Sequence, residues 1–272
     1  MAISRIDRAS ESERLIAPEI FNDAFYDAIM GLSQFEELKN VLEIGSSAGD
    51  GSTSAFVRGL MLNKNRPTLY CIEVSHSRFG ELQKKYQSHD FVKCYNVSSV
   101  SSSRVAAESE IRNFYHSHKT TLNKYKLPVV LGWREEGLRY LTEHGDLDQD
   151  GILMIKETNN IEVFDLVLID GSEFTGMAEM NDIYGAKIIC LDDINAYKCY
   201  GARQKLLNDS AYELLAENKL LRNGFSIFYR VDAACQLRAI KAVHEAMQSD
   251  TDTRRLSMRG GVRAIRRALM RL

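Results

Sequence analysis

The chain has 272 residues, of which 44% are hydrophobic and 26% charged, and its formal net charge is −2. This is an ordinary globular composition, and so small a net charge predicts no general attraction to nucleic acid. No apolar run reaches the ~20 residues of a membrane span, and the N-terminal residues lack the apolar core of a signal peptide. We therefore expect a cytoplasmic protein built on one sizeable α/β domain with additions.

The cysteine pattern agrees with a cytoplasmic location. No two cysteines have the C-x-x-C spacing of a metal or redox site, so we expect reduced and mostly buried thiols, with a catalytic cysteine as the minor alternative. The five are Cys71, Cys94, Cys190, Cys199 and Cys235.

The N-terminal segment, residues 1–37, is expected to be helical in its second half. Residues 1–16 are charged and predicted to be loosely packed. From Pro18 apolar residues recur every three or four positions, which predicts a helix that packs against the domain. They are Ile20, Phe21, Ala24, Phe25, Ala28 and Ile29.

A glycine-rich turn then follows an apolar run at 40–44, and a helix is expected over about 51–63. Gly45 and Gly49 can take backbone angles that other residues resist, and they allow a ligand to approach the main chain. The helix start beyond them offers free N–H groups. With Gly51 the spacing is G-x-x-x-G-x-G, which differs from the nicotinamide pattern G-x-G-x-x-G, and Glu43 stands two residues before the first glycine.

The second predicted strand, residues 68–74, carries Glu73 at its end. An acid at this place in a βαβ unit can accept hydrogen bonds from two ribose hydroxyls. A helix over 76–87 and a short strand over 91–96 should follow. The next stretch, 97–104, is predicted to be a largely solvated loop at the mouth of the site. Its serines are Ser98, Ser99, Ser101, Ser102 and Ser103.

Residues 97–146 are interpreted as an insertion that shapes a substrate pocket. Within it we expect helices at 105–118 and 134–144, separated by a connection at 122–128 and a short apolar segment at 129–133. Three histidines lie here, and surface positions are favoured over a role as catalytic base. They are His116, His118 and His144.

Acids end the fourth and fifth predicted strands. Asp170 follows the run 166–169, and Asp192 and Asp193 follow 187–191. Carboxyl ends of parallel strands meet at one edge of a sheet, where three carboxylates repel unless a cation or a proton intervenes. Oxygen ligands suit Mg²⁺ or Ca²⁺. The alternative is that these acids bind backbone amides or cap the next helix. Lys198 could orient an acceptor, although a solvated helix-surface lysine is the commoner case.

These landmarks, followed by two strands at 212–217 and 225–231 around Asn223-Gly224, resemble the class I S-adenosylmethionine-dependent methyltransferases over about residues 38–231. Within them, the run from Asp170 to Ile194 is similar to bacterial metal-dependent O-methyltransferases of small molecules and glycans. The resemblance implies a doubly wound, Rossmann-like seven-stranded α/β sheet, mostly parallel with an antiparallel last strand. The domain would span 38–232.

The resemblance also implies site roles. Asp170, Asp192 and Asp193 would bind a metal, with Mg²⁺ as the ion, and Asp170 and Lys198 would be catalytic in methylating a small-molecule or sugar hydroxyl. Rival interpretations are a metal-independent N- or O-methyltransferase, a hydroxylase on the same fold, and a non-catalytic binding module. The residues implied to hold S-adenosylmethionine are Glu43, Gly45, Ser46, Ser47, Gly49, Ser52, Thr53, Glu73, Asp170 and Gly171.

The C-terminal segment, residues 233–272, differs from the domain. A helix is expected over 233–246, and arginines without any acid after Asp252 form a basic amphipathic pattern over 254–272. A docking helix or mobile tail is favoured over contact with an anionic membrane surface or acidic partner. We expect no nucleic-acid partner and no transmembrane span. The sequence leaves open whether the protein forms a homo-oligomer.

Overall fold

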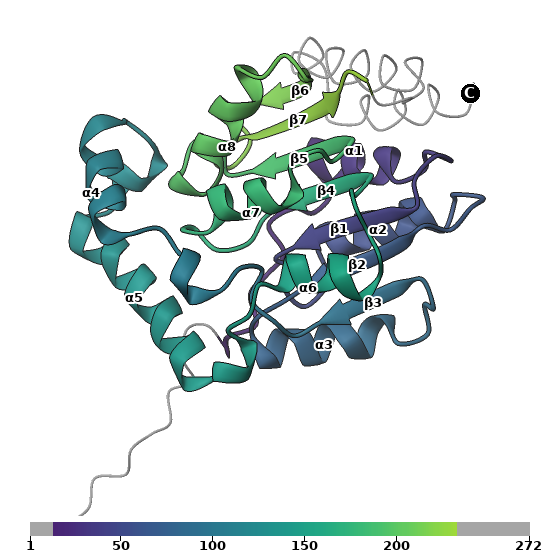
Figure 1. The fold of residues 1–272 in the computed structure, drawn as a ribbon, viewed down its shortest axis with the longest axis horizontal. Helices are drawn as coiled ribbons and strands as arrows, with labels where there is room; N and C mark the ends of the chain where they lie inside the picture. The colour runs from purple at the N-terminus through teal and green to yellow at the C-terminus, as the bar shows by residue number, and fades with distance from the viewer. Residues whose placement is uncertain (1–12, 233–272) are drawn as a thin grey trace, which may run out of the picture.

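The computed structural model describes residues 13–232, and a seven-stranded sheet runs through their centre (Figure 1). The strand order is β3-β2-β1-β4-β5-β7-β6, and β7 alone runs antiparallel to both of its neighbours. The predicted mostly parallel α/β sheet with an antiparallel last strand is therefore confirmed. The strands are β1 (Asn40–Ile44), β2 (Thr68–Ile72), β3 (Val92–Tyr95), β4 (Leu166–Ile169), β5 (Ile188–Asp192), β6 (Tyr212–Asn218) and β7 (Phe225–Arg230).

Helices cover both faces of the sheet because the central strands are apolar on both sides. In β4, Leu166 and Leu168 face one core while Val167 and Ile169 face the other. The first core is closed by α1 (Ala24–Leu32), α2 (Ser52–Leu60) and α3 (His76–Tyr86). The second is closed by α6 (Gly151–Thr158), α7 (Gly176–Ile183) and α8 (Tyr197–Leu207).

The insertion lies beyond the edge where the parallel strands end (Figure 1). Its helices, α4 (Glu108–Ser117) and α5 (Leu127–Glu143), share a small apolar core with Phe174 of the loop after β4. The Ala106 N–H donates to the Phe174 carbonyl at 3.0 Å, which attaches the insertion to that loop. Short 3-10 turns complete it at Ser102–Arg104, Thr121–Lys124 and Gly145–Leu147.

Two expectations about helices need correction, and one helix was not expected. The apolar segment 129–133 is the first part of α5, which begins at Leu127 with Pro128 in its first turn, a place that proline favours. The N-terminal helix begins at Ala24 rather than Pro18, because Asp23 caps it by accepting from the Phe25 and Tyr26 amides at 2.9 Å. Helix α6 was not predicted, since its apolar run is too short to show a helical period.

Some expectations fall outside this range. Residues 1–12, the helix expected at 233–246, Cys235 and the basic stretch 254–272 are not among the described residues. Within 13–232, no helix combines the length and apolar character needed to cross a membrane.

Candidate functional site

The glycine turn after β1 closes tightly against β4. Gly45 has φ +86° and Gly49 φ +81°, a region that disfavours side chains. A Cβ on Gly45 would lie 2.2 Å from the Asp170 carbonyl oxygen, and one on Gly49 would lie 2.7 Å from the Tyr86 ring. The turn therefore requires glycine for its packing against the fold as well as for its backbone angles.

Glu43 supports this turn from the protein interior. It is fully buried, and its carboxylate accepts hydrogen bonds from the hydroxyls of Ser52 at 2.6 Å and Thr53 at 2.7 Å. Burial raises its pKa, and the same hydrogen bonds oppose that rise. Glu43 thus joins β1 to the first turn of α2. Glu43 and Thr53 line neither of the two cavities described below, whereas Ser52 reaches one of them.

Glu73 stands just after β2 and faces the same turn. It is 5% exposed, and its two oxygens accept from the Ser47 and Ser75 amides, each at 2.8 Å. Burial raises the pKa of Glu73 against the effect of these bonds. A carboxylate has about four acceptor directions, so two remain for a ligand.

Two cavities meet at Glu73. The first, of about 200 Å³, we call the loop cavity; it is lined by Gly45, Ser46, Ser47 and Glu73, and by Asp170, Asp193 and Lys198 at the strand ends. The second, of about 270 Å³, we call the α5 cavity, and it shares Gly45, Glu73 and Arg78 with the first. Its remaining lining is largely apolar and includes Ile44, Ile72, Val97, Trp133, Leu138, Tyr140 and Leu141, with Ser98, Ser99 and Gly171.

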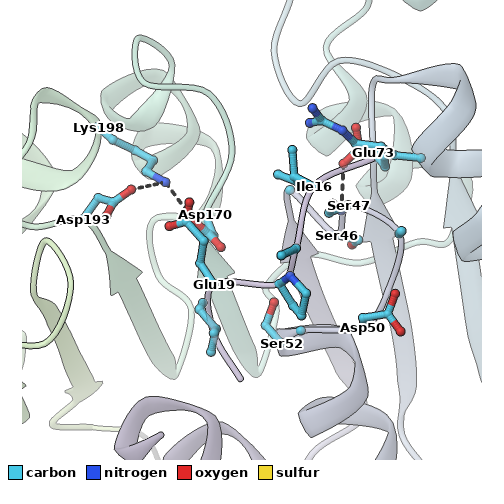
Figure 2. Close-up of a pocket in the computed structure, with 17 residues that line it drawn as sticks. Ile16, Glu19, Ser46, Ser47, Asp50, Ser52, Glu73, Asp170, Asp193 and Lys198 are labelled. Atoms are coloured by element: carbon cyan, nitrogen blue, oxygen red, sulfur yellow. Dashed lines mark hydrogen bonds and ion pairs between the residues drawn. The ribbon is translucent and has the colours of Figure 1, made fainter. Parts of the chain in front are cut away.

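The acidic strand ends come together as the sequence predicted, but with a lysine among them. Carboxylate oxygens of Asp170, Asp192 and Asp193 lie within 4.8 Å of one another. The Lys198 ammonium lies 2.7 Å from Asp170 Oδ1 and 2.6 Å from Asp193 Oδ2 (Figure 2). Arg222 donates to Asp192 Oδ1 at 2.9 Å. Lys198 is only 6% exposed, so the solvated lysine favoured by the sequence analysis is wrong.

The pKa values of Asp170 and Lys198 depend on each other. Burial raises the pKa of Asp170 well above its usual value, and the contact with Lys198 opposes that rise. Burial alone would lower the pKa of Lys198, but the neighbouring carboxylates hold it well above the usual range. Lys198 is therefore a charged cation placed between two of the three carboxylates expected to share Mg²⁺. With it there, two of the three carboxylates expected to hold Mg²⁺ are already paired with a cation of the chain.

Residues 13–20 form a segment that we call the N-terminal strap, and its residues 16–20 cross the loop cavity (Figure 2). Figure 2 shows Ile16 of the strap between Glu73 on one side and Asp170 on the other. The strap has no helix or strand after Glu13, so no local pattern over residues 13–17 marks it in the sequence. The loose packing expected for residues 1–16 fits Leu15 and Ile16, which are 60% and 50% exposed, whereas Glu13 is held by hydrogen bonds.

Glu13 anchors the strap at the start of α3. Its carboxylate accepts from the Ser77 amide at 2.9 Å and the His76 amide at 3.2 Å, and from the Tyr140 hydroxyl of α5. Burial would raise the pKa of Glu13, but these hydrogen bonds outweigh it and set the pKa at about 2. Arg78 Nε also donates to the Arg14 carbonyl at 2.8 Å.

The serine loop is more structured than expected. Ser98 and Ser99 are buried and line the α5 cavity. Ser102 bonds to Asp148 through its amide and its hydroxyl, both at 2.6 Å. Arg104 pairs with Asp150 at 2.8 Å and so holds the loop against the start of α6.

The three histidines of the insertion line neither cavity. His118 stacks on Phe114 with ring centroids 4.6 Å apart, and His144 packs against His76 at 4.8 Å. Among the described cysteines, Cys71, Cys190 and Cys199 are buried, Cys94 is half-buried, and all are free thiols.

No family model and no curated protein matches the chain. Solved structures resemble it in part. A putative caffeoyl-CoA O-methyltransferase from Staphylococcus aureus has 13% identity and a TM-score of 0.46, covering 78% of this chain and 85% of that one. An O-methyltransferase from Bacillus cereus in complex with SAH has 12% identity and a TM-score of 0.42, covering 76% and 79%. A putative O-methyltransferase from Klebsiella pneumoniae has 11% identity and a TM-score of 0.44, covering 76% and 78%.

Proposed function

We propose that this protein transfers a methyl group from S-adenosylmethionine to a hydroxyl of a small-molecule or sugar acceptor. The observation that carries the proposal is the pair of cavities that meet at Glu73, at the edge where the parallel strands end. This edge is where open α/β sheets bind their ligands. The cofactor would supply an electrophilic methyl group on a sulfonium, and the chain's own residues would bind and orient both partners.

The chemistry of the cavities suits each part of that cofactor. The α5 cavity is mostly apolar and fits a purine ring, with Ser98 and Ser99 as polar contacts. Glu73 has acceptor capacity left for the two ribose hydroxyls. The loop cavity offers charged and hydroxyl side chains beside the glycine turn, which suit an amino-acid end.

The acceptor would bind near Asp170 and Lys198, which both line the loop cavity. A buried carboxylate with a raised pKa is suited to accept the proton of a hydroxyl. The neighbouring ammonium would stabilise negative charge that develops on the acceptor oxygen. This assigns proton acceptance to Asp170 and charge stabilisation to Lys198, without a step that uses a metal.

Titration of S-adenosylhomocysteine into the full-length protein by calorimetry tests the cofactor assignment. We expect saturable binding, and we expect Glu73→Ala to weaken it by at least about 10-fold, because hydrogen bonds to a carboxylate are lost. Glu81→Ala is the matched control, since Glu81 is an exposed glutamate of α3 that lines neither cavity. An absence of binding by folded wild-type protein would overturn the proposal.

A further inference from the structure

The geometry points to Lys198 as the built-in cation of the acidic cluster: its ammonium takes the place of a divalent ion between Asp170 and Asp193, so the native protein binds no such ion there. Replacing Lys198 should turn the same three carboxylates into a metal site. This inference concerns ion binding and holds whether or not methyl transfer is the reaction.

The backbone of Lys198 is held from two sides. Glu173 accepts from the Tyr197 and Lys198 amides, at 2.8 and 3.3 Å, and so fixes the start of α8. On the other side, a Cβ on Gly176 would lie only 1.8 Å from the Lys198 carbonyl oxygen, so α7 packs directly against this turn. The side chain therefore leaves a fixed position and reaches the carboxylates at ordinary ion-pair distances.

A divalent ion in the cluster would compete with the two cations that already pair with its carboxylates. Four carboxylates face these two cations, because Lys198 pairs with Asp170 and Asp193 while Arg222 is shared by Asp192 and Asp23. A divalent ion bound to the same oxygens would stand next to the ammonium and repel it. If the ion displaced Lys198, a buried ammonium would lose its counter-charges, which is a strongly unfavourable state.

The carboxylates nevertheless have the right separation for a metal once the lysine is gone. Their ligand oxygens lie within 4.8 Å of one another, which matches two opposite oxygen–metal distances of about 2.1–2.4 Å. Asp192 Oδ2 is buried and has no hydrogen-bond partner among residues 13–232. Without Lys198, repulsion between the acids would favour uptake of a cation.

The test uses Mn²⁺, whose free form is counted by electron paramagnetic resonance, with the full-length protein. We expect no saturable site in the wild type and one saturable site in Lys198→Met, so any residual binding of Mn²⁺ by the wild type should be at least about 10-fold weaker. Lys198→Arg keeps a cation at this position and should gain no Mn²⁺ site. Adding Asp193→Asn to Lys198→Met should abolish the gained site, which places it at the cluster.

Lys85→Met is the matched control, because it removes a lysine from an ion pair with Asp50 at the rim of the loop cavity and should create no site. Wild-type protein that binds one Mn²⁺ as tightly as Lys198→Met would overturn the inference, and so would a folded Lys198→Met that binds none. If Lys198→Met does not fold, Lys198→Gln replaces it in the same titration. Titration with S-adenosylhomocysteine remains a separate measurement, so failure of either proposal can be recognised on its own.

Discussion

Glu43 and Glu73 are buried glutamates near the ends of neighbouring strands, yet their carboxylates contact different partners. Glu43 bonds to two hydroxyls of α2 behind the glycine turn, whereas Glu73 bonds to two amides and lines both cavities. Alternation along β1 puts Glu43 on the same face as Val41, toward α2. The sequence predicts that both residues stand at the edge where a ligand binds. Only the structure shows that Glu43 supports the glycine turn while Glu73 lines the cavities.

Gly45 provides a prediction about stability. Gly45→Ala should destabilise the protein by about 2–4 kcal/mol, because the residue has positive φ and a Cβ would lie 2.2 Å from the Asp170 carbonyl oxygen. Gly80→Ala is a control whose expected change in stability has the opposite sign. Gly80 lies inside α3 with no atom within 4 Å of its Cβ position, so alanine should stabilise by about 0.5–1 kcal/mol. Urea unfolding measures both, and equal effects would contradict the argument.

At the scale of elements, the acidic strand ends were predictable and the lysine among them was not. An apolar run that ends in an acid is visible in the sequence before Asp170 and before Asp192, and parallel strands bring such ends together. The direction of Lys198 depends on where α8 begins, and Glu173 fixes that point through a contact across 24 residues of chain. No local pattern contains such information.

The N-terminal strap contains no helix or strand after Glu13, and its hydrogen bonds predict an effect on exchange of the proposed cofactor. Glu13→Gln should speed dissociation of S-adenosylhomocysteine by about 10-fold, because the strap crosses the loop cavity and a charged hydrogen-bond acceptor is lost at its anchor. Tyr140→Phe removes a donor to the same carboxylate and should act in the same direction. Stopped-flow displacement measures the rate.

Glu108→Gln serves as the control for the strap, since Glu108 forms an exposed pair with Arg112 within α4. Unchanged dissociation rates in both anchor variants would show that the strap does not limit exchange. The pKa of Glu13, about 2 against a usual 4.5, means that its anchoring contribution is complete above about pH 4.5 and is lost as the pH falls toward 2. The strap should therefore stay anchored across the neutral range.

At the scale of the whole molecule, the sheet follows from the order of apolar runs, whereas the insertion depends on contacts between distant segments. The α4–α5 pair is attached through bonds such as the Thr121 amide to the Asn195 carbonyl, at 2.8 Å. Helix α5 has 17 residues, but only Val130, Leu131, Tyr140 and Leu141 are buried, so its apolar period is weak and its start is hard to recognise in the sequence. The α5 cavity exists only because this helix returns over the sheet edge, so its lining could not be deduced from the motifs.

The stability of the molecule should depend on pH through Glu173. Burial raises the pKa of this residue from 4.5 to about 7, although its bonds to the α8 amides oppose the rise. Because the folded pKa is raised, the stabilising contribution is complete below about pH 4.5 and declines as the pH rises through about 7. Glu173→Gln keeps an oxygen acceptor for the helix start but has no titrating proton. Its free energy of unfolding should therefore rise relative to wild type over this interval and level off above it.

Urea unfolding of both proteins at several pH values between about 5 and 8 measures the difference. Glu81→Gln, which changes an exposed glutamate of α3, should give a difference from wild type that is constant over the same range. A constant difference for Glu173→Gln as well would mean that the buried carboxyl at the start of α8 does not take up a proton on folding. The start of α8, and with it the position of Lys198, would then be equally stable on both sides of neutrality.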